Sequence, residues 1–317
     1  MREWRPTATG QILRARAQLM AAIRTFFAER DIIEVDTPLL AAAPPSEAQL
    51  ACFSVGGEAG YLVPSPEHAL KRLLAAGVGS LYQLGPVFRA GEAGRWHNPE
   101  FTMLEWYRPG WTMSALIAEV GTLLQAVTDC EAPIRTTYAT LFRECTGLDA
   151  HHAAAAELAA YARAAGLAPT GIAPADQESR AFWLDLIMSV AITPTLGFDA
   201  PVCVEDFPID DAVLIAIRDG DPAIAERFEI YWRGQELANG AQELTDAVLA
   251  RERMQREQNK RAAAGLPLPP LDERLLAAMT YGMPECAGVA LGVDRLLALQ
   301  QNADCLADVL PFAWSRR

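Results

Sequence analysis

The sequence lacks the positive charge that would mark a general nucleic-acid-binding protein. Its 27 lysines and arginines stand against 40 aspartates and glutamates, for a formal net charge of -13 over 317 residues. A chain of this charge provides no diffuse positive field to hold a polyanionic backbone. Generic nucleic-acid binding is therefore disfavoured, although a local basic patch stays compatible with the composition.

Long apolar runs are also absent. No stretch of the chain reaches the roughly 18 consecutive apolar residues that a membrane-spanning helix needs. The first 20 residues are polar and already helical in pattern, unlike a secretory leader. We therefore expect a soluble, cytoplasmic protein without a membrane partner.

The cysteines are few and scattered. The six of them form no Cys-x-x-Cys pair and no Cys/His cluster at the spacing of metal ligands, which is typical of reduced cytosolic thiols. A Walker motif and a Gly-x-Gly-x-x-Gly loop after a strand are missing as well. The sequence therefore points away from zinc proteins and from P-loop and Rossmann enzymes.

What is present is enough apolar sequence for a large core. Half of the residues are apolar, and we expect one compact domain over residues 1–317. Apolar residues recur at helical spacing over 12–30, and the alanine-rich segment at about 113–191 is interpreted as a helical insertion. A charged helix is expected over 243–265.

Strand patterns complete the expected fold. Residues 80–89 (SLYQLGPVFR) and 98–108 (NPEFTMLEWYR) are strand-like and could pair as an antiparallel hairpin. Strands and helices are unevenly segregated along the chain, which favours an α+β fold over a βαβ repeat. We predict an antiparallel β-sheet flanked by helices.

Polar and aromatic residues gather around the turn of the expected hairpin. An Arg fork suits a phosphate, an Asn side chain suits a purine edge, and an aromatic face suits base stacking. Any one of them alone would be an ordinary strand-edge residue. Their density predicts a nucleotide site. The residues concerned are Arg89, Glu92, Arg95, His97, Asn98 and Phe101.

Two later segments carry further candidate residues. In RGQELANGAQELTD, Glu236 and Glu243 could share a hard cation such as magnesium, but two such glutamates are also typical of a solvated face. In GVALGVDR, Gly292 joins a strand to a helix and Arg295 projects from the first helical turn. The same glycine also fits a plain packing turn.

These segments stand in the order of the three class II aminoacyl-tRNA synthetase motifs. The extended stretch that ends at Pro38 resembles motif one, FR…HNPEFTMLEWYRP resembles motif two, and GVALGVDR resembles motif three. Together with the ELANG…EL segment, these motif sequences are similar to those of the lysyl-tRNA synthetases. Over nearly the whole chain the sequence resembles one paralogous family, the elongation factor P–lysine ligases. The resemblance implies a class II synthetase-type catalytic domain.

Three features favour the ligases over the synthetases. The chain begins almost at the motif-one helix, so we expect no OB-fold anticodon-binding domain. The segments SPEHALKRLLAAG and HNPEFTMLEWYRP are similar to the corresponding segments of the ligase sequences. Ala290 stands where the synthetases usually carry glycine, and one methyl group in a pocket discriminates related substrates by about 1 to 3 kcal/mol. The implied substrate is (R)-β-lysine in preference to α-lysine.

The resemblance implies how ATP binds as co-substrate. Arg89 would contact the α-phosphate and Arg295 the γ-phosphate, while Phe101 would stack on adenine and Asn98 would lie near its edge. The implied Mg2+ ligands are Glu236 and Glu243. The implied catalytic set is Arg89, Glu236, Glu243 and Arg295. The ATP site would be completed by Gly91, Glu92, Leu237 and Gly292.

The resemblance also implies an acidic pocket for the amino acid. Glu105, Tyr107 and Glu243 would receive the ammonium groups of the substrate, since an unpaired buried ammonium is costly. The remaining pocket residues would be Ser65, Pro66, Glu67, Asn239 and Ala290. The substrate carboxylate would attack the α-phosphorus of ATP, and a lysine amine on elongation factor P would attack the resulting adenylate. A homodimer is expected and tRNA is not expected as a partner.

Two positions depart from the family pattern. Glu92 follows Arg89 by three residues where the synthetases place the glutamate two after, and Ala241 replaces an aromatic residue, which could loosen side-chain selectivity. Two alternatives stay open: a minimal lysyl-tRNA synthetase-like enzyme, and a catalytically silent synthetase-like binding or regulatory protein. The joint presence of the catalytic set argues against the silent protein, which has no chemical need for it.

Overall fold

The computed structural model describes residues 4–47, 50–56 and 60–317. The chain divides into two units. Unit 1 contains Met1–Asp129 and Glu243–Arg317, and unit 2 contains Cys130–Gln242. No helix of the described residues is long and apolar enough to cross a membrane.

Unit 1 is built on four neighbouring strands in the order β1-β5-β6-β12. Their bounds are β1 (Ile33–Glu34), β5 (Leu81–Phe88), β6 (Glu100–Pro109) and β12 (Cys286–Gly292). β5 and β6 pair antiparallel with Phe88 opposite Glu100, so the predicted hairpin is confirmed. β12 pairs antiparallel with β6, whereas β1 is parallel to β5. A smaller sheet has the order β2-β4-β3, with bounds Leu40–Ala41, Gly60–Leu62 and Ser54–Val55.

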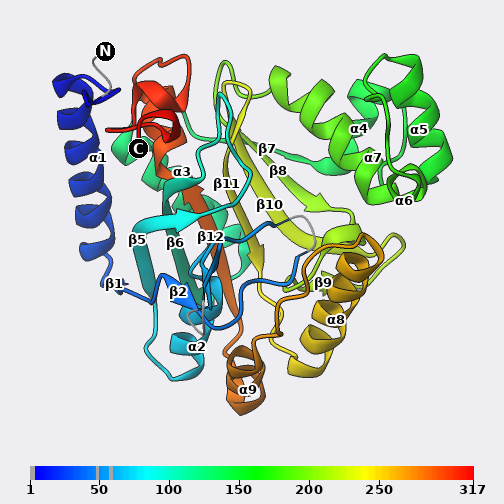
Figure 1. Ribbon diagram of the computed structural model, residues 1–317, viewed down its shortest axis with the longest axis horizontal. Helices are drawn as coiled ribbons and strands as arrows, with labels where there is room; N and C mark the ends of the chain where they lie inside the picture. The colour runs from blue at the N-terminus through cyan, green and yellow to red at the C-terminus, as the bar shows by residue number, and fades with distance from the viewer. Residues whose placement is uncertain (1–3, 48–49, 57–59) are drawn as a thin grey trace. The chain divides into compact units, whose positions relative to one another are not determined.

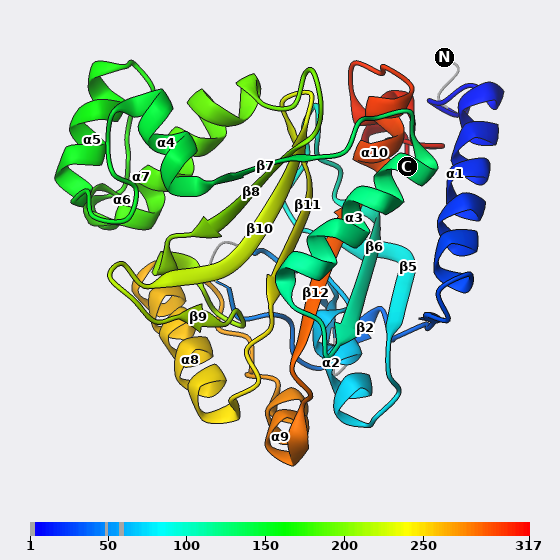
Figure 2. The same ribbon diagram turned by 180° about the vertical axis from the view of Figure 1, so that it is seen from behind.

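Helices cover one face of the unit 1 strands. α3 crosses in front of β6 and β12 in Figure 2 and lies behind them in Figure 1. The β6 side chain Trp106 faces this layer, because its indole Nε1 donates to Glu119 Oε2 on α3 and its ring meets Phe27 of α1 edge-on. Successive strand residues point to opposite faces, so Glu105 and Tyr107 lie on the other face of β6. The helices of unit 1 are α1 (Gly10–Ala28), α2 (Glu67–Ala75), α3 (Met113–Val127), α8 (Ala247–Ala263), α9 (Glu273–Gly282) and α10 (Val293–Gln300).

Local sequence sets the ends of these helices. The Thr9 side chain accepts from Ile12 N and caps α1, which buries Leu19 and Ile23 on the face that the apolar spacing predicted. The helix predicted over 12–30 is therefore confirmed. α2 begins after Pro66, and Gly77 follows it with φ +82°, a conformation that favours glycine.

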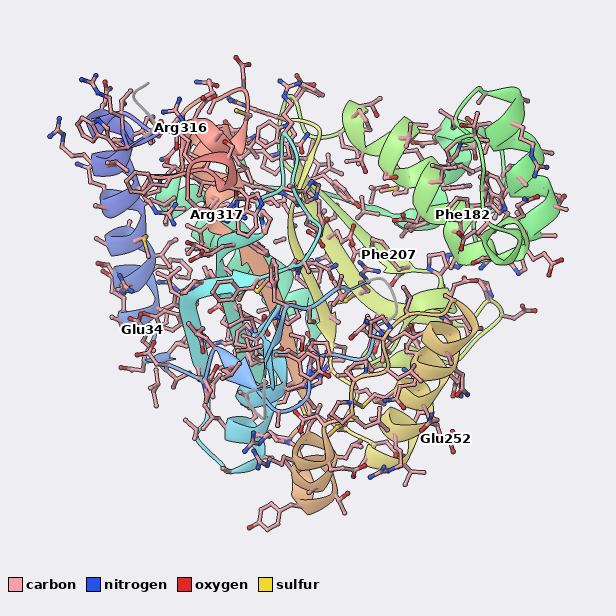
Figure 3. All side chains as sticks on the ribbon, viewed as in Figure 1. Glu34, Phe182, Phe207, Glu252, Arg316 and Arg317 are labelled. Atoms are coloured by element: carbon pink, nitrogen blue, oxygen red, sulfur yellow. The ribbon has the colours of Figure 1, made fainter. Side chains whose placement is uncertain are left out.

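Unit 2 has the strand order β11-β10-β8-β7, with β9 beside β10. The bounds are β7 (Ile134–Thr137), β8 (Val202–Phe207), β9 (Ile217–Arg218), β10 (Ile224–Trp232) and β11 (Gln235–Gln242). β7 and β8 are parallel, and the other pairs are antiparallel. Trp183 and Phe142 are fully buried in its core. Phe207 lies 4.9 Å from Tyr138 between ring centroids, and Phe182 contacts Trp183 edge-on. Figure 3 labels Phe182 and Phe207 among the side chains of this unit.

The helices of unit 2 correspond to most of the predicted helical insertion. They are α4 (Tyr138–Thr146), α5 (Ala155–Ala164), α6 (Pro174–Glu178) and α7 (Arg180–Ile187), with a short π-helix at Met188–Ile192 and short 3-10 helices at Thr193–Thr195 and Ile209–Asp211. The predicted range 113–191 also contains α3, which belongs to unit 1, and the strand β7. The α+β class is confirmed, with two parallel pairings added to the antiparallel sheet. The prediction of one catalytic domain stays a prediction.

Candidate active site

The face of β6 opposite α3 carries a buried carboxylate with both oxygens occupied. Glu105 is 2% exposed, and it accepts 2.7 Å hydrogen bonds from Ser65 Oγ and from the Tyr107 hydroxyl. Ser65 Oγ also accepts from Glu67 N at 3.0 Å, so one hydroxyl joins the start of α2 to β6. Burial and the charge of Glu67 raise the pKa of Glu105 to about 7. This carboxyl is therefore poised to lose its proton when a cation arrives.

Two further carboxylates, those of Glu67 and Glu243, contact one buried lysine. Lys71 Nζ lies 2.5 Å from Glu67 Oε1 and 2.6 Å from Glu243 Oε2, and its side chain is 0% exposed. Burial works against its charge, but Glu243 and Glu67 outweigh it and raise the pKa of Lys71. Burial and Glu67 raise the pKa of Glu243 to about 7, although Lys71 opposes this shift. The pKa of Glu67 is lowered, because Lys71 and His68 outweigh its burial.

The backbone of β12 forms one side of the amino-acid pocket. Glu243 N donates to Cys286 O at 3.0 Å, which fixes the residue beside the strand. Gly288 stands opposite Tyr107 in the sheet register, and Ala290 stands opposite Glu105. Opposite residues of paired strands share a face, so the Ala290 methyl lies on the pocket face. The structure thus brings together the predicted pocket residues of unit 1, namely Ser65, Pro66, Glu67, Glu105, Tyr107, Glu243 and Ala290.

The predicted nucleotide residues of unit 1 gather around the β5–β6 turn. The Arg89 guanidinium lies 5.2 Å from the centroid of the Phe101 ring, and Arg89 Nε is buried without a hydrogen-bond partner among the described residues. Arg89 Nη1 lies 4.0 Å from Glu92 Oε2, so Glu92 reaches the same guanidinium despite its shifted position. Gly91 has φ +80° and lets the turn bend between them. A buried N–H without a partner is what an anionic ligand would satisfy.

Arg295 and Asn98 approach this turn from two directions. Arg295 follows Gly292 in the first turn of α10 and contacts Trp96 O at 3.2 Å and His97 Nε2 at 2.9 Å. Asn98 donates to Glu100 O at 2.5 Å and accepts from Trp314 N at 3.0 Å. The Asn98 amide thus holds the turn, and its contact with an adenine edge stays a prediction.

The remaining predicted residues, Glu236, Leu237 and Asn239, lie on β11 of unit 2. Asn239 Nδ2 donates to Glu229 Oε1 at 3.1 Å, and Asn239 Oδ1 accepts from Arg227 Nε at 3.2 Å, which fixes the orientation of its amide. Glu229 is buried and also contacts Arg227 and the Tyr231 hydroxyl. Burial, with Glu236 as a smaller cause and Arg227 opposing, raises the pKa of Glu229 to about 7.

The contacts of the acidic side chains bear on which of them could bind the expected Mg2+. Glu236 carries a carboxylate whose charge acts on the neighbouring Glu229, and a hard divalent cation relieves such like-charge pairs. Glu243 is a less apt ligand, because an ammonium already lies 2.6 Å from its Oε2. Glu229 is no more apt, because its Oε1 accepts from Arg227 and Asn239 and its Oε2 accepts from the Tyr231 hydroxyl. Ligation of Mg2+ by Glu236 and Glu243 stays a prediction.

Several residues of the site carried too weak a signal in the sequence. Lys71 is spaced four residues from Glu67, which also describes an ordinary surface pair on a helix. Asp294 is 2% exposed and joins Arg16 of α1 to Thr102 N of β6, directly before Arg295. Glu47 Oε2 is buried and has no hydrogen-bond partner within residues 4–47, 50–56 and 60–317, and burial and Glu67 raise the pKa of Glu47. Lys71 lies within SPEHALKRLLAAG and Asp294 within GVALGVDR, but the motif resemblance implied no role for either residue, and Glu47 lies outside the quoted segments.

The sheet, the hairpin turn and the helix after β12 together define a class of protein. Residues 1–316 match the family model described as tRNA synthetases class II (D, K and N). The chain is 45% identical over 318 residues to the elongation factor P–(R)-β-lysine ligase of Photorhabdus laumondii, with 98% of this chain and 97% of the relative covered. It is 44% identical over 324 residues to the protein of that name from Edwardsiella ictaluri, with 100% and 99% covered. The chain belongs to the class II tRNA synthetase family and, within it, to the family of elongation factor P–(R)-β-lysine ligases. The predicted resemblance is confirmed.

Proposed function

We propose that this chain is an ATP-dependent ligase that activates (R)-β-lysine as an acyl-adenylate and joins it to the ε-amine of a lysine on elongation factor P. The observation that carries the substrate class is the carboxylate cluster of Glu67, Glu105 and Glu243. A substrate with two ammonium groups needs such acids, because a buried unpaired ammonium is costly. The names of the relatives support the specific amino acid and acceptor.

The first step joins the amino-acid carboxylate to the α-phosphorus of ATP. An oxygen–phosphorus bond forms, the bond to the β-phosphate oxygen breaks, and pyrophosphate leaves with the electron pair. Arg89, whose Nε has no hydrogen-bond partner in the described part of the chain, would neutralise charge on the α-phosphate, and Phe101 would stack on the adenine. Arg295 would approach the outer phosphates from α10. The protein would supply orientation and charge rather than a covalent intermediate.

The second step forms an amide. A neutral lysine amine of elongation factor P attacks the carbonyl carbon of the adenylate, AMP leaves, and the amine loses a proton. Mg2+, for which Glu236 and Glu243 are the predicted ligands, would screen the phosphate charges when bound. We further propose that the protein acts in the cytoplasm as a homodimer and that tRNA is not its acceptor.

Pyrophosphate exchange tests the activation step. The purified protein is assayed with (R)-β-lysine, (S)-β-lysine, α-lysine and norleucine, which lacks the side-chain ammonium. The proposal expects the highest kcat/KM with (R)-β-lysine and no exchange with norleucine. Glu105→Gln should raise the KM for the amino acid, whereas Glu100→Gln, an exposed residue on the same strand, should leave it unchanged. A preference for α-lysine with charging of tRNA would favour the synthetase alternative, and no exchange with any amino acid would favour the silent protein.

A further inference from the structure

The chain uses lysine at only two of its 27 basic positions, Lys71 and Lys260, and one of the two is fully buried. Lys260 lies on α8 with a side chain that is 50% exposed and forms an ion pair with Glu257 on the same helix. Lys71 instead joins Glu67 of its own helix to Glu243, which stands beside β12. A compact ammonium with rotatable donors can bridge two carboxylates where the planar fork of arginine is bulkier.

The burial of Lys71 calls for an explanation beyond packing. Charged residues are almost never fully buried unless they are paired, and removing one partner of such a pair leaves a charge uncompensated. The two partners of Lys71 are carboxylates of the proposed amino-acid pocket. Glu67 also acts on Glu105, where its charge helps to raise the pKa. Lys71 therefore sits at the centre of the acids that a cationic substrate would meet.

The backbone of β12 at Gly288 limits how far the Glu243 side chain can move. A Cβ added at Gly288 would lie 2.5 Å from Glu243 Oε1, so the backbone of the strand comes directly against this carboxylate. One oxygen of Glu243 thus faces β12, and the other is held by the Lys71 ammonium at 2.6 Å. The ammonium and the strand together define one pose of the Glu243 carboxylate.

We infer that Lys71 is a positioning residue of the amino-acid pocket: its ammonium holds Glu67 and Glu243 in place and offsets one of the three negative charges of Glu67, Glu105 and Glu243. Two negative charges then remain for a substrate with two ammonium groups. Without Lys71, the carboxylates of Glu67 and Glu243 would repel one another and lose the ammonium that fixes their positions. This inference deepens the proposed function and rests on it.

A positioning role and a purely structural ion pair give different kinetics. A purely structural pair would lower thermal stability and, through the folded fraction, the apparent kcat, while the KM values for the amino acid and for ATP stay unchanged. A positioning residue would raise the KM for the amino acid while the KM for ATP stays unchanged. The split between these two constants is therefore the deciding readout.

The first experiment measures pyrophosphate exchange with Lys71→Met, Lys71→Arg and the control Lys260→Met. We expect Lys71→Met to raise the amino-acid KM by about tenfold or more with the KM for ATP within about twofold. Lys71→Arg should recover part of the loss, and Lys260→Met should match the unaltered protein. The double variant Glu67→Gln/Lys71→Met should lose less than the product of the two single losses, because both charges of one pair are removed. Folded Lys71→Met with an unchanged amino-acid KM would overturn the inference.

A second measurement needs no variant. Protein labelled with 15N-lysine has only two side-chain ammonium groups, and the Lys260→Met spectrum assigns them. We expect the Lys71 ammonium signal to persist at neutral pH, to shift when (R)-β-lysine is added and to stay in place when ATP alone is added. If the Lys71 ammonium signal does not shift when (R)-β-lysine is added, the inference is overturned, even if the Lys71 variants do not fold. If the unaltered protein shows no exchange with any amino acid, the proposed function fails, and this titration still decides whether Lys71 responds to a bound diamino acid.

Discussion

Gly288 and Tyr107 stand opposite each other on β12 and β6, and a Cβ added at Gly288 would lie 2.3 Å from Tyr107 Cε1. The same Cβ would lie 2.5 Å from Glu243 Oε1. Both neighbours are hydrogen-bonded or ion-paired within the pocket, so neither can move away without breaking a contact. Only glycine allows the strand to approach the two side chains this closely.

Gly288→Ala should therefore damage the pocket while the protein stays folded. Displacing Tyr107 and Glu243 by about 1 Å should lower kcat/KM for the amino acid by about 100-fold. The KM for ATP should change little. Gly10→Ala is the control, because its Cβ would meet nothing nearer than 3.9 Å. Equal kinetics for the two variants would contradict the pocket geometry.

Substrate binding should depend on pH near neutrality. The pKa values of Glu105 and Glu243 are raised to about 7, mainly by burial with Glu67 adding to the effect. As pH falls through 7, both carboxyls take up protons and the pocket loses negative charge. The KM for the amino acid should rise on the acid side of pH 7, while the KM for ATP should not follow this profile. A flat amino-acid KM between pH 6 and pH 8, on the order of one unit either side of these pKa values, would contradict this account.

The same shift has a consequence for the stability of the empty protein. The folded pKa of Glu105 lies above the unfolded value of about 4.3. Its contribution to stability is therefore fully present below the unfolded pKa and is lost as pH rises through 7. Thermal unfolding without ligand should show this loss, and Glu105→Gln should reduce it. An unchanged pH dependence in the variant would show that other groups are responsible.

Ala290 offers a test of amino-acid selectivity. Its methyl group lies on the same face of the sheet as the opposite residue Glu105. Ala290→Gly should shift the ratio of kcat/KM for (R)-β-lysine and α-lysine towards α-lysine by about 1 to 3 kcal/mol. Pyrophosphate exchange with both amino acids measures the ratio. A shift towards (R)-β-lysine would contradict the assignment of this methyl group to the pocket floor.

Asp294 should be important for stability. It is 2% exposed, pairs with Arg16 and accepts from Thr102 N at 2.8 Å, so it ties α10 to α1 and β6. Asp294→Asn leaves the Arg16 charge without its partner and should lower the free energy of unfolding by about 3 kcal/mol. Asp304→Asn, at a residue whose side chain is 95% exposed, should change it by less than about 0.5 kcal/mol. Denaturant unfolding compares the two.

The sequence predicted the parts of the fold and the site that depend on the local spacing of apolar residues and on recognisable sequence motifs. The hairpin around Arg89, the amphipathic α1 and the strand-to-helix junction at Gly292 follow from spacing, turns and charge. The parallel pairing of β1 with β5 was not predicted, since β1 has only two residues and carries no periodic signal. Two residues cannot establish an alternating pattern.

The buried ionic contacts were missed for a different reason. Lys71 meets Glu243 only through the tertiary fold, and Asp294 meets Arg16 from the opposite end of the chain. Neither contact has a characteristic spacing. Local sequence rules describe neighbours along a helix or strand, whereas these pairs depend on how distant elements pack. The structure was needed to find them.

The transfer step tests the central claim most directly. Purified elongation factor P is incubated with the protein, ATP and (R)-β-lysine, and its intact mass and modified peptide are determined by mass spectrometry. The account expects one β-lysyl addition on one lysine of the factor and none on total tRNA incubated in parallel. Aminoacylated tRNA with an unmodified factor would contradict the account and identify the chain as a minimal synthetase.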